Sequence, residues 1–257
     1  MSEEKSHQGL VVDQFGAQAH AYLTSEVHAR GEDLVQIAGL IARARPARVL
    51  DMGCGAGHAS FAAAPHAGEV TAFDLSSEML AVVSQAAAGR GFSNVKTEAG
   101  SALDLPFADK SFDAVISRYS AHHWGDIAKG VSEAARVLKP GGVAAFADVI
   151  APVSTVCDTF MQAIEILRDT SHVRDDSRAQ WEAHARAAGL TVTGVTEYRL
   201  PLDFTSWIGR MRTPPVFVAA IRQLQDSVSS DVRRYFEIRP DGSFTLDMMV
   251  MELAKEG

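Results

Sequence analysis

The middle of the chain alternates between two hydrophobic patterns. Short runs rich in β-branched and aromatic residues predict strands at residues 48–51, 69–73, 94–97, 112–117 and 143–147. Longer segments between them, such as 77–89 and 126–138, carry apolar side chains at helical spacing. Strands that alternate with helices indicate βαβ units, so we expect an α/β fold with a mostly parallel sheet and helices on both faces.

The two flanks follow other patterns. Residues 9–44 carry apolar side chains at helical spacing. After Asp148 we expect a helix near 154–167, an irregular polar stretch at 168–177, a helix ending near Gly189, a strand near 191–199, a helical stretch over about 204–230 and a hairpin that turns at 239–242. We therefore expect one domain over residues 1–257, with a core at 45–150 and helical N-terminal and C-terminal lid elements at about 9–44 and 154–235.

Charge and composition narrow the function. The chain has 24 Lys and Arg against 32 Asp and Glu, a net charge of −8, without a basic stripe, which argues against a nucleic-acid partner. Cys54 and Cys157 are too few for a disulfide framework or a cysteine metal cluster, and we predict no metal site. The sequence shows neither an apolar signal segment near its start nor a run long enough to span a bilayer. We expect a cytoplasmic protein, monomeric or homodimeric.

A glycine-rich loop follows the first predicted strand. Gly53, Gly55 and Gly57 alternate after Asp51 and before a helix, at the sheet edge where open α/β folds bind ligands. Glycine lets the backbone approach a ligand closely, and Asp51 could bind a cationic amine or order the loop. The spacing differs from the Gly-x-Gly-x-x-Gly of dinucleotide-binding folds, and no P-loop lysine follows. A tight structural turn is the alternative interpretation.

Asp74 ends the second predicted strand and makes a ligand site more specific. A carboxylate at this position can accept both hydroxyls of a ribose that lies across the first two strand ends. The alternative role is a helix N-cap, which Ser76 could equally provide. The glycine loop, Asp74 and Met79 one turn later are together more specific than any one of them.

With these motifs, residues 48–148 resemble the class I S-adenosylmethionine (SAM)-dependent methyltransferases, in the branch of ubiquinone and menaquinone methyltransferases (methyltransferase type 11). The resemblance rests on residues 49–57, 73–80, 102–107, 112–124 and 134–148. It implies a Rossmann-like, mostly parallel seven-stranded sheet and SAM as the cofactor. It also implies methyl transfer to a small-molecule acceptor, with O- or C-methylation favoured.

The same resemblance implies a set of cofactor contacts. Asp74 would bind the ribose, and Ser101 stands where the family commonly has an acid that receives the adenine amino group. Recognition there would use water or the backbone of Ala102. Arg118 would approach the methionine end through its backbone. The expected cofactor-binding residues are Asp51, Gly53, Cys54, Gly55, Gly57, Asp74, Leu75, Met79, Ser101, Ala102, Arg118 and Tyr22.

His122 and His123 follow the fourth predicted strand and are the candidate bases. Methyl transfer to a hydroxyl or a carbon requires removal of a proton, and a histidine with an ordinary pKa of about 6.5 suits that step. In similar small-molecule O-methyltransferases a histidine at this position pairs with an aspartate after the fifth strand, which would be Asp148. We expect only one of the two histidines to face the cavity. Packing or a helix start is the alternative role.

Four further polar residues are candidates for binding the acceptor: Arg168, His172, Arg210 and Arg212. A solvated loop and a surface helix are the alternatives, and the sequence does not identify the acceptor. Two other functions stay open, a SAM-binding protein without catalysis and a nucleotide-dependent oxidoreductase. The glycine spacing and the lack of a Tyr-x-x-x-Lys pair disfavour the oxidoreductase.

Overall fold

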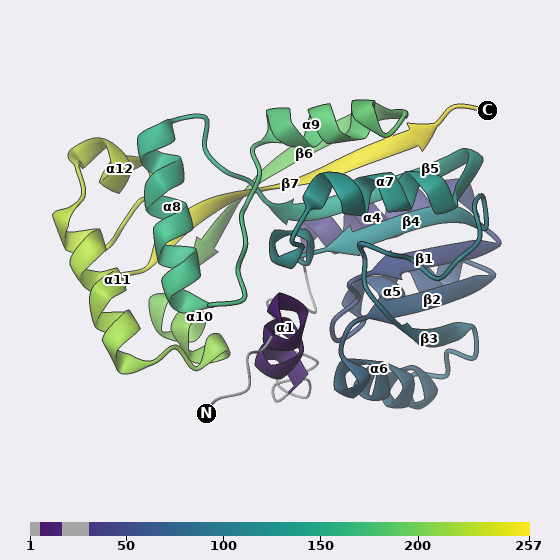
Figure 1. Cartoon of the computed structure of the whole chain (residues 1–257), viewed down its shortest axis with the longest axis horizontal. Coiled ribbons are helices and arrows are strands. Elements are labelled where there is room, and N and C mark those ends of the chain that lie inside the picture. The colour runs from purple at the N-terminus through teal and green to yellow at the C-terminus, as the bar shows by residue number, and fades with distance from the viewer. Residues whose placement is uncertain (1–5, 17–30) are drawn as a thin grey trace.

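A seven-stranded sheet forms the centre of the molecule (Figure 1). The computed structural model describes residues 6–16 and 31–257. The strand order is β3-β2-β1-β4-β5-β7-β6; β1 to β5 are parallel, and β7 runs antiparallel to its neighbours β5 and β6. The strands are β1 (Arg48–Met52), β2 (Glu69–Asp74), β3 (Val95–Ala99), β4 (Phe112–Arg118), β5 (Leu138–Val149), β6 (Leu190–Leu202) and β7 (Phe244–Lys255).

Helices cover both faces of this sheet because its central strands alternate their side chains between two apolar cores. Val49 of β1 packs in the core beneath α4 and α5, whereas Leu50 packs in the core beneath α7 and α9. These helices, with α6 beside β2 and β3, are α4 (Glu32–Ala44), α5 (His58–Ala63), α6 (Ser77–Gly89), α7 (Ile127–Val137) and α9 (Arg178–Ala187). The chain also forms the short 3-10 helices η1 (Ala64–His66) and η2 (Ala121–His123).

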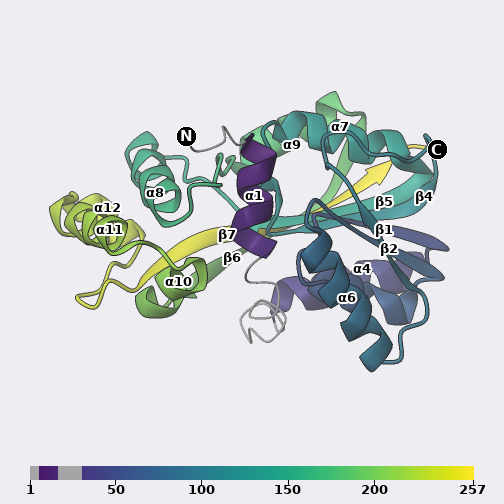
Figure 2. The same ribbon diagram turned by 60° about the horizontal axis from the view of Figure 1, so that its bottom comes forward.

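A further apolar core lies beyond the carboxyl ends of the parallel strands, where β6 and β7 extend past the rest of the sheet (Figure 1). Its helices are α8 (Thr155–Arg168), α10 (Phe204–Met211), α11 (Pro215–Ser227) and α12 (Ser230–Tyr235). Figure 2 shows α1 (His7–Gly16) between these helices and α6. Residues of the sheet edge, α1, α8 and α10 line one cavity.

The expected α/β fold with a mostly parallel seven-stranded sheet is confirmed. Three details differ. β5 begins at Leu138, because the turn at 139–142 stays in the sheet as a bulge where the register with β4 shifts. The helical stretch over 204–230 is divided at Thr213-Pro214-Pro215, since proline cannot continue α10. The hairpin is wrong: the 239–242 turn joins α12 to β7, which pairs with β5 and β6. Within 6–16 and 31–257, no helix has the length and apolar character of a membrane span.

Candidate active site

A cavity lies at the carboxyl ends of β1, β2, β4 and β5, the position that open α/β sheets use for ligands. Residues from the loop after β1 and from the end of β2 line one side of it. Helix α1, η2, α8 and α10 contribute the other walls. Residues that are far apart in sequence, such as Phe15, His123 and Met211, therefore border the same space.

The glycine loop adopts a conformation that requires glycine. Gly53, Gly55 and Gly57 have φ angles of 68°, 49° and 83°, in the left-handed region that other residues rarely occupy. The Gly53 and Cys54 amides donate to the Phe73 carbonyl at 2.8 and 3.0 Å, which fixes the loop against β2. A side chain on Gly55 would enter open space within the cavity lining. Gly53, Cys54 and Gly55 line the cavity. Gly57 packs against Phe61 and Val83 instead.

Asp51 is fully buried under this loop and has one carboxylate oxygen available. The Ser60 hydroxyl donates to Oδ2 at 2.6 Å, whereas Oδ1 has no hydrogen-bond partner among the described residues. Burial raises the pKa of Asp51 to about 7 despite the hydrogen bonds from Ser60. A ligand ammonium group at Oδ1 would supply the missing donor and would favour the ionised form.

Asp74 holds the glycine loop and does not cap the next helix. Its carboxylate accepts the Gly55 amide at 2.8 Å and the Ser76 amide at 2.9 Å. The N-cap of α6 is Ser76, whose hydroxyl accepts the Met79 amide. Burial raises the pKa of Asp74, although its backbone hydrogen bonds oppose the shift. Each carboxylate oxygen has a further lone pair, so Asp74 can accept ligand hydroxyls as well.

Another part of the cavity lining combines apolar side chains with Ser101. Leu75, Met79, Ser101 and Ala102 all line it. The Gln8 side chain of α1 donates from Nε2 to the Ser101 hydroxyl at 3.0 Å. The N-terminal helix therefore contacts the position where the family commonly has an acid. Sequence reasoning missed Gln8, because a polar residue on a short helix carries no signal of its own.

Arg118 lines the cavity, and its side chain is tied to the protein. Its buried guanidinium forms an ion pair with Asp33 of α4 and packs on the Tyr119 ring, with 4.6 Å from Cζ to the ring centroid. Tyr22, the remaining expected cofactor contact, lies outside the described residues.

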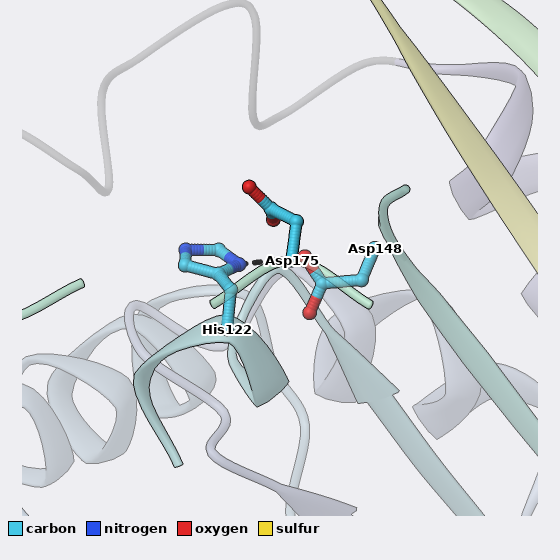
Figure 3. Close-up of side chains that lie close together, drawn as sticks. All are labelled: His122, Asp148 and Asp175. Carbon is cyan, nitrogen blue, oxygen red and sulfur yellow. Dashed lines mark hydrogen bonds and ion pairs between the residues drawn. The ribbon is translucent and has the colours of Figure 1, made fainter. Parts of the chain in front are cut away.

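His122 and Asp148 form a hydrogen-bonded pair (Figure 3). The distance from His122 Nδ1 to Asp148 Oδ1 is 2.6 Å, and Asp148 Oδ2 accepts the Ala121 amide. Burial alone would lower the pKa of His122. The charge and hydrogen bond of Asp148, with the charges of Asp175 and Glu165, outweigh burial and raise this pKa to about 9. Asp148 lies behind the cavity wall and orients the ring of His122, which lines the cavity.

His123 has a different environment. Its Nδ1 lies 3.1 Å from the Ser171 carbonyl, and its ring makes an edge contact with Phe15 of α1 at a centroid distance of 4.8 Å. Burial, followed by the charge of His122, lowers the pKa of His123 to about 3. The expectation that only one of the two histidines faces the cavity is wrong. Both line it, because the tight η2 turn places them side by side.

Two acids that sequence reasoning missed also line the cavity near His122. They are Glu165 on α8 and Asp175 in the 169–177 segment. His122, Asp148 and Asp175 offer ligand atoms within 4.8 Å of one another, the spacing of a candidate metal group. However, two ligands of one ion stand about 3 Å or more apart when each bond is about 2.0–2.2 Å. The 2.6 Å contact between His122 and Asp148 therefore fits a shared proton better than a shared ion.

The four additional polar candidates divide into two groups. Arg168 and Arg210 line the cavity, whereas His172 and Arg212 do not border it. Arg168 donates from Nε to the Trp207 carbonyl at 3.1 Å, and its Nη1 lies 3.4 Å from Glu165. His172 hydrogen-bonds to Gln162 at 3.0 Å, and Arg212 adopts the left-handed conformation that ends α10.

Comparison with known proteins shows which families and proteins this chain is similar to. A family described as "Methyltransferase domain" matches residues 50–146. YafE, an uncharacterized protein of Escherichia coli, is 47% identical over 77% of this chain and 96% of its own length. YcgJ of Bacillus subtilis, named an uncharacterized methyltransferase, is 41% identical over 78% of this chain and 79% of its own. Its crystal structure matches with a TM-score of 0.81 at 35% identity, covering 87% of this chain and 99% of that one. A demethylmenaquinone methyltransferase of Chlorobaculum parvum is 39% identical over 44% of this chain and 45% of its own.

Proposed function

Because this chain belongs to the family of SAM-dependent methyltransferases, we propose that it methylates a hydroxyl or a carbon of a small-molecule acceptor, with His122 as the base. The hydrogen-bonded His122–Asp148 pair supports this proposal most directly, because His122 lines the same cavity as the glycine loop and Asp148 orients it from behind. Bound SAM supplies an electrophilic methyl group on a sulfonium.

The residues of the loop are suited to hold SAM. The free Oδ1 of Asp51 would accept the ammonium of the methionine part, and Gly53, Cys54 and Gly55 would pack along it. Asp74 would bind the ribose, while Leu75, Met79, Ser101 and Ala102 would surround the adenine. Gly57 supports the loop conformation from outside the cavity. Helix α1 and the C-terminal helices would act as a lid over the core at 45–150.

His122 and Asp148 divide the acid–base work. The neutral imidazole of His122 would take the proton of the acceptor as the methyl group moves. Asp148 would hold the tautomer and the ring position and would stabilise the imidazolium that forms. His123, whose pKa is lowered, would stay neutral and pack under α1. The remaining cavity walls would align the acceptor and exclude water.

The binding specificity tests the cofactor assignment. In titration calorimetry we expect SAM and S-adenosylhomocysteine to bind, and NAD and ATP to bind hardly at all, because the loop spacing and Asp74 suit a ribose without a pyrophosphate. Transfer of tritium from methyl-labelled SAM into a small-molecule extract then tests catalysis. Clear NAD binding without SAM binding would overturn the cofactor assignment.

The pH dependence tests the role of Asp148. Only the neutral imidazole accepts a proton, so kcat/KM should rise with pH through the pKa of His122, which is raised to about 9. The Asp148→Asn substitution removes the charge that raises this pKa and weakens the hydrogen bond, so the rising limb should move to lower pH. Asp176→Asn, which removes the charge of an aspartate that contacts His184 at 2.8 Å outside the cavity lining, is the matched control. A limb that stays in place in Asp148→Asn would contradict the pairing.

A further inference from the structure

Four buried carboxyl groups lie at the cavity: Glu165, Asp169 and Asp175 line it, and Asp148 lies behind it against His122. Three of them have partners. Asp148 binds His122 at 2.6 Å, and Glu165 lies 3.4 Å from Arg168. Asp169 accepts the hydroxyl and the amide of Ser171 at 2.6 and 2.9 Å.

Asp175 is the exception. It is 2% exposed and lines the cavity, yet its Oδ2 has no hydrogen-bond partner among the described residues. Gln162 fixes the backbone on both sides of this side chain, because it accepts the Asp175 amide at 3.2 Å and donates to the Asp175 carbonyl at 2.9 Å. Figure 3 shows the side chains of His122, Asp148 and Asp175 close together.

Within the part of the chain that the structure describes, no basic side chain forms a hydrogen bond with Asp175 Oδ2. His172 Nε2 lies 3.8 Å away and is engaged with Gln162 at 3.0 Å, and burial lowers the pKa of His172 to about 2. Arg174 binds Asp158 at 2.6 Å instead. Burial raises the pKa values of Asp175 and Glu165. An unpaired buried carboxylate is costly, and a ligand that brings donors and positive charge removes that cost.

The same cavity also has an apolar lining. Arg168 contacts both kinds of lining, because its guanidinium lies over the Trp207 ring, 5.0 Å from the centroid, and its Nη1 lies 3.4 Å from Glu165. The apolar lining consists of Val149, Leu200, Leu202, Trp207, Met211 and Leu246. A ligand that complements both the buried carboxyl groups and the apolar lining has an apolar body and a polar, proton-donating end.

We propose that the methyl acceptor is an apolar amine whose ammonium group binds Asp175 Oδ2, with Glu165 beside it. An ammonium provides three donors and the missing charge, whereas a neutral hydroxyl provides no charge and an anion would be repelled. The ammonium is a recognition group. Because Asp175 and His122 are close neighbours, the methylated hydroxyl or carbon lies within a few bonds of it. This inference rests on the proposed function.

Matched probes test the acceptor class. Hexylamine, hexanol and hexanoate share one apolar body and differ in charge. We expect calorimetry on the protein saturated with S-adenosylhomocysteine to show hexylamine binding about tenfold or more tighter than hexanol, with hexanoate weakest. Asp175→Asn should remove this preference without weakening hexanol. Asp226→Asn on α11, outside the cavity lining, should behave as the wild type.

The outcomes separate the two proposals. Absence of S-adenosylhomocysteine binding would refute the cofactor assignment. Normal binding of it, with equal affinities for hexylamine and hexanol or with a preference that survives Asp175→Asn, would overturn only the acceptor class. Binding of Mn²⁺, detected by electron paramagnetic resonance and lost in Asp175→Asn, would identify a cation site instead. If Asp175→Asn does not fold, Glu165→Gln should reduce the same preference, and an unchanged preference there would overturn the proposal.

Discussion

Replacement of His122 by alanine should lower kcat by about 10²–10⁴-fold, the usual contribution of a positioned general base. The affinity for S-adenosylhomocysteine should remain nearly unchanged, because the proposed cofactor contacts are made by Asp51, Asp74 and the glycine loop and not by His122. The measurement is tritium transfer from labelled SAM at saturating acceptor, with cofactor affinity determined separately by calorimetry. A loss in kcat at constant affinity identifies an interaction made in the transition state.

Two variants control this experiment. His66→Ala removes an exposed histidine of η1, outside the cavity lining, and should leave kcat unchanged. His123→Ala should affect the packing of α1 more than the proton transfer, since His123 contacts Phe15. If a variant that lacks both His122 and His123 retains near-normal kcat, the acceptor is already nucleophilic and the His122–Asp148 pair is structural.

The second large effect concerns cofactor affinity. Asp74→Ala should weaken S-adenosylhomocysteine binding by about 5- to 150-fold, the equivalent of about 1–3 kcal/mol for hydrogen bonds lost to a carboxylate. The variant also loses the contact that holds the Gly55 amide at 2.8 Å. Calorimetry at constant pH provides both affinities.

An analogue of S-adenosylhomocysteine without ribose hydroxyls distinguishes direct contact from loop ordering. The wild type should bind this analogue more weakly than the natural compound, and Asp74→Ala should bind the two nearly equally. Asp126→Ala, which removes the N-cap of α7 away from the loop, should bind as the wild type. If Asp74→Ala discriminates as strongly as the wild type, Asp74 serves only to order Gly55.

The parallel half of the fold could be predicted because its signals are local. Residues 77–89 form α6 as expected, since Ser76 caps the helix and its apolar positions face the sheet. The strands β1 and β2 begin at Arg48 and Glu69, polar residues that are followed by β-branched runs. By contrast, β7 has no partner nearby in sequence. Its register with β5 and β6 depends on contacts between segments far apart in the chain, and a hairpin was the simpler local interpretation.

The candidate site shows the same division. Asp51, Asp74 and the glycines could be found from their positions after strands, because the topology places those ends together. The preference for His122 over His123 could not be found, since it depends on the orientation of two adjacent rings around a tight turn. Glu165 and Asp175 could be recognised as candidate site residues only from their burial in the structure. A carboxylate in a polar stretch is ordinary until the fold excludes water from it.

The position of β7 between β5 and β6 has a consequence for how the chain folds. β6 precedes β7 in the sequence, yet within residues 6–16 and 31–257 β7 is the only strand paired with it. Until β7 inserts, β6 has no hydrogen-bonded partner, and α10 to α12 lack the strands on which their apolar core forms. We therefore expect the sheet around β7 and the apolar core of α10 to α12 to form in one late, long-range step. Such a step slows folding and leaves an unpaired strand open to self-association. The many exposed side chains along β6 reduce that risk before the sheet is complete.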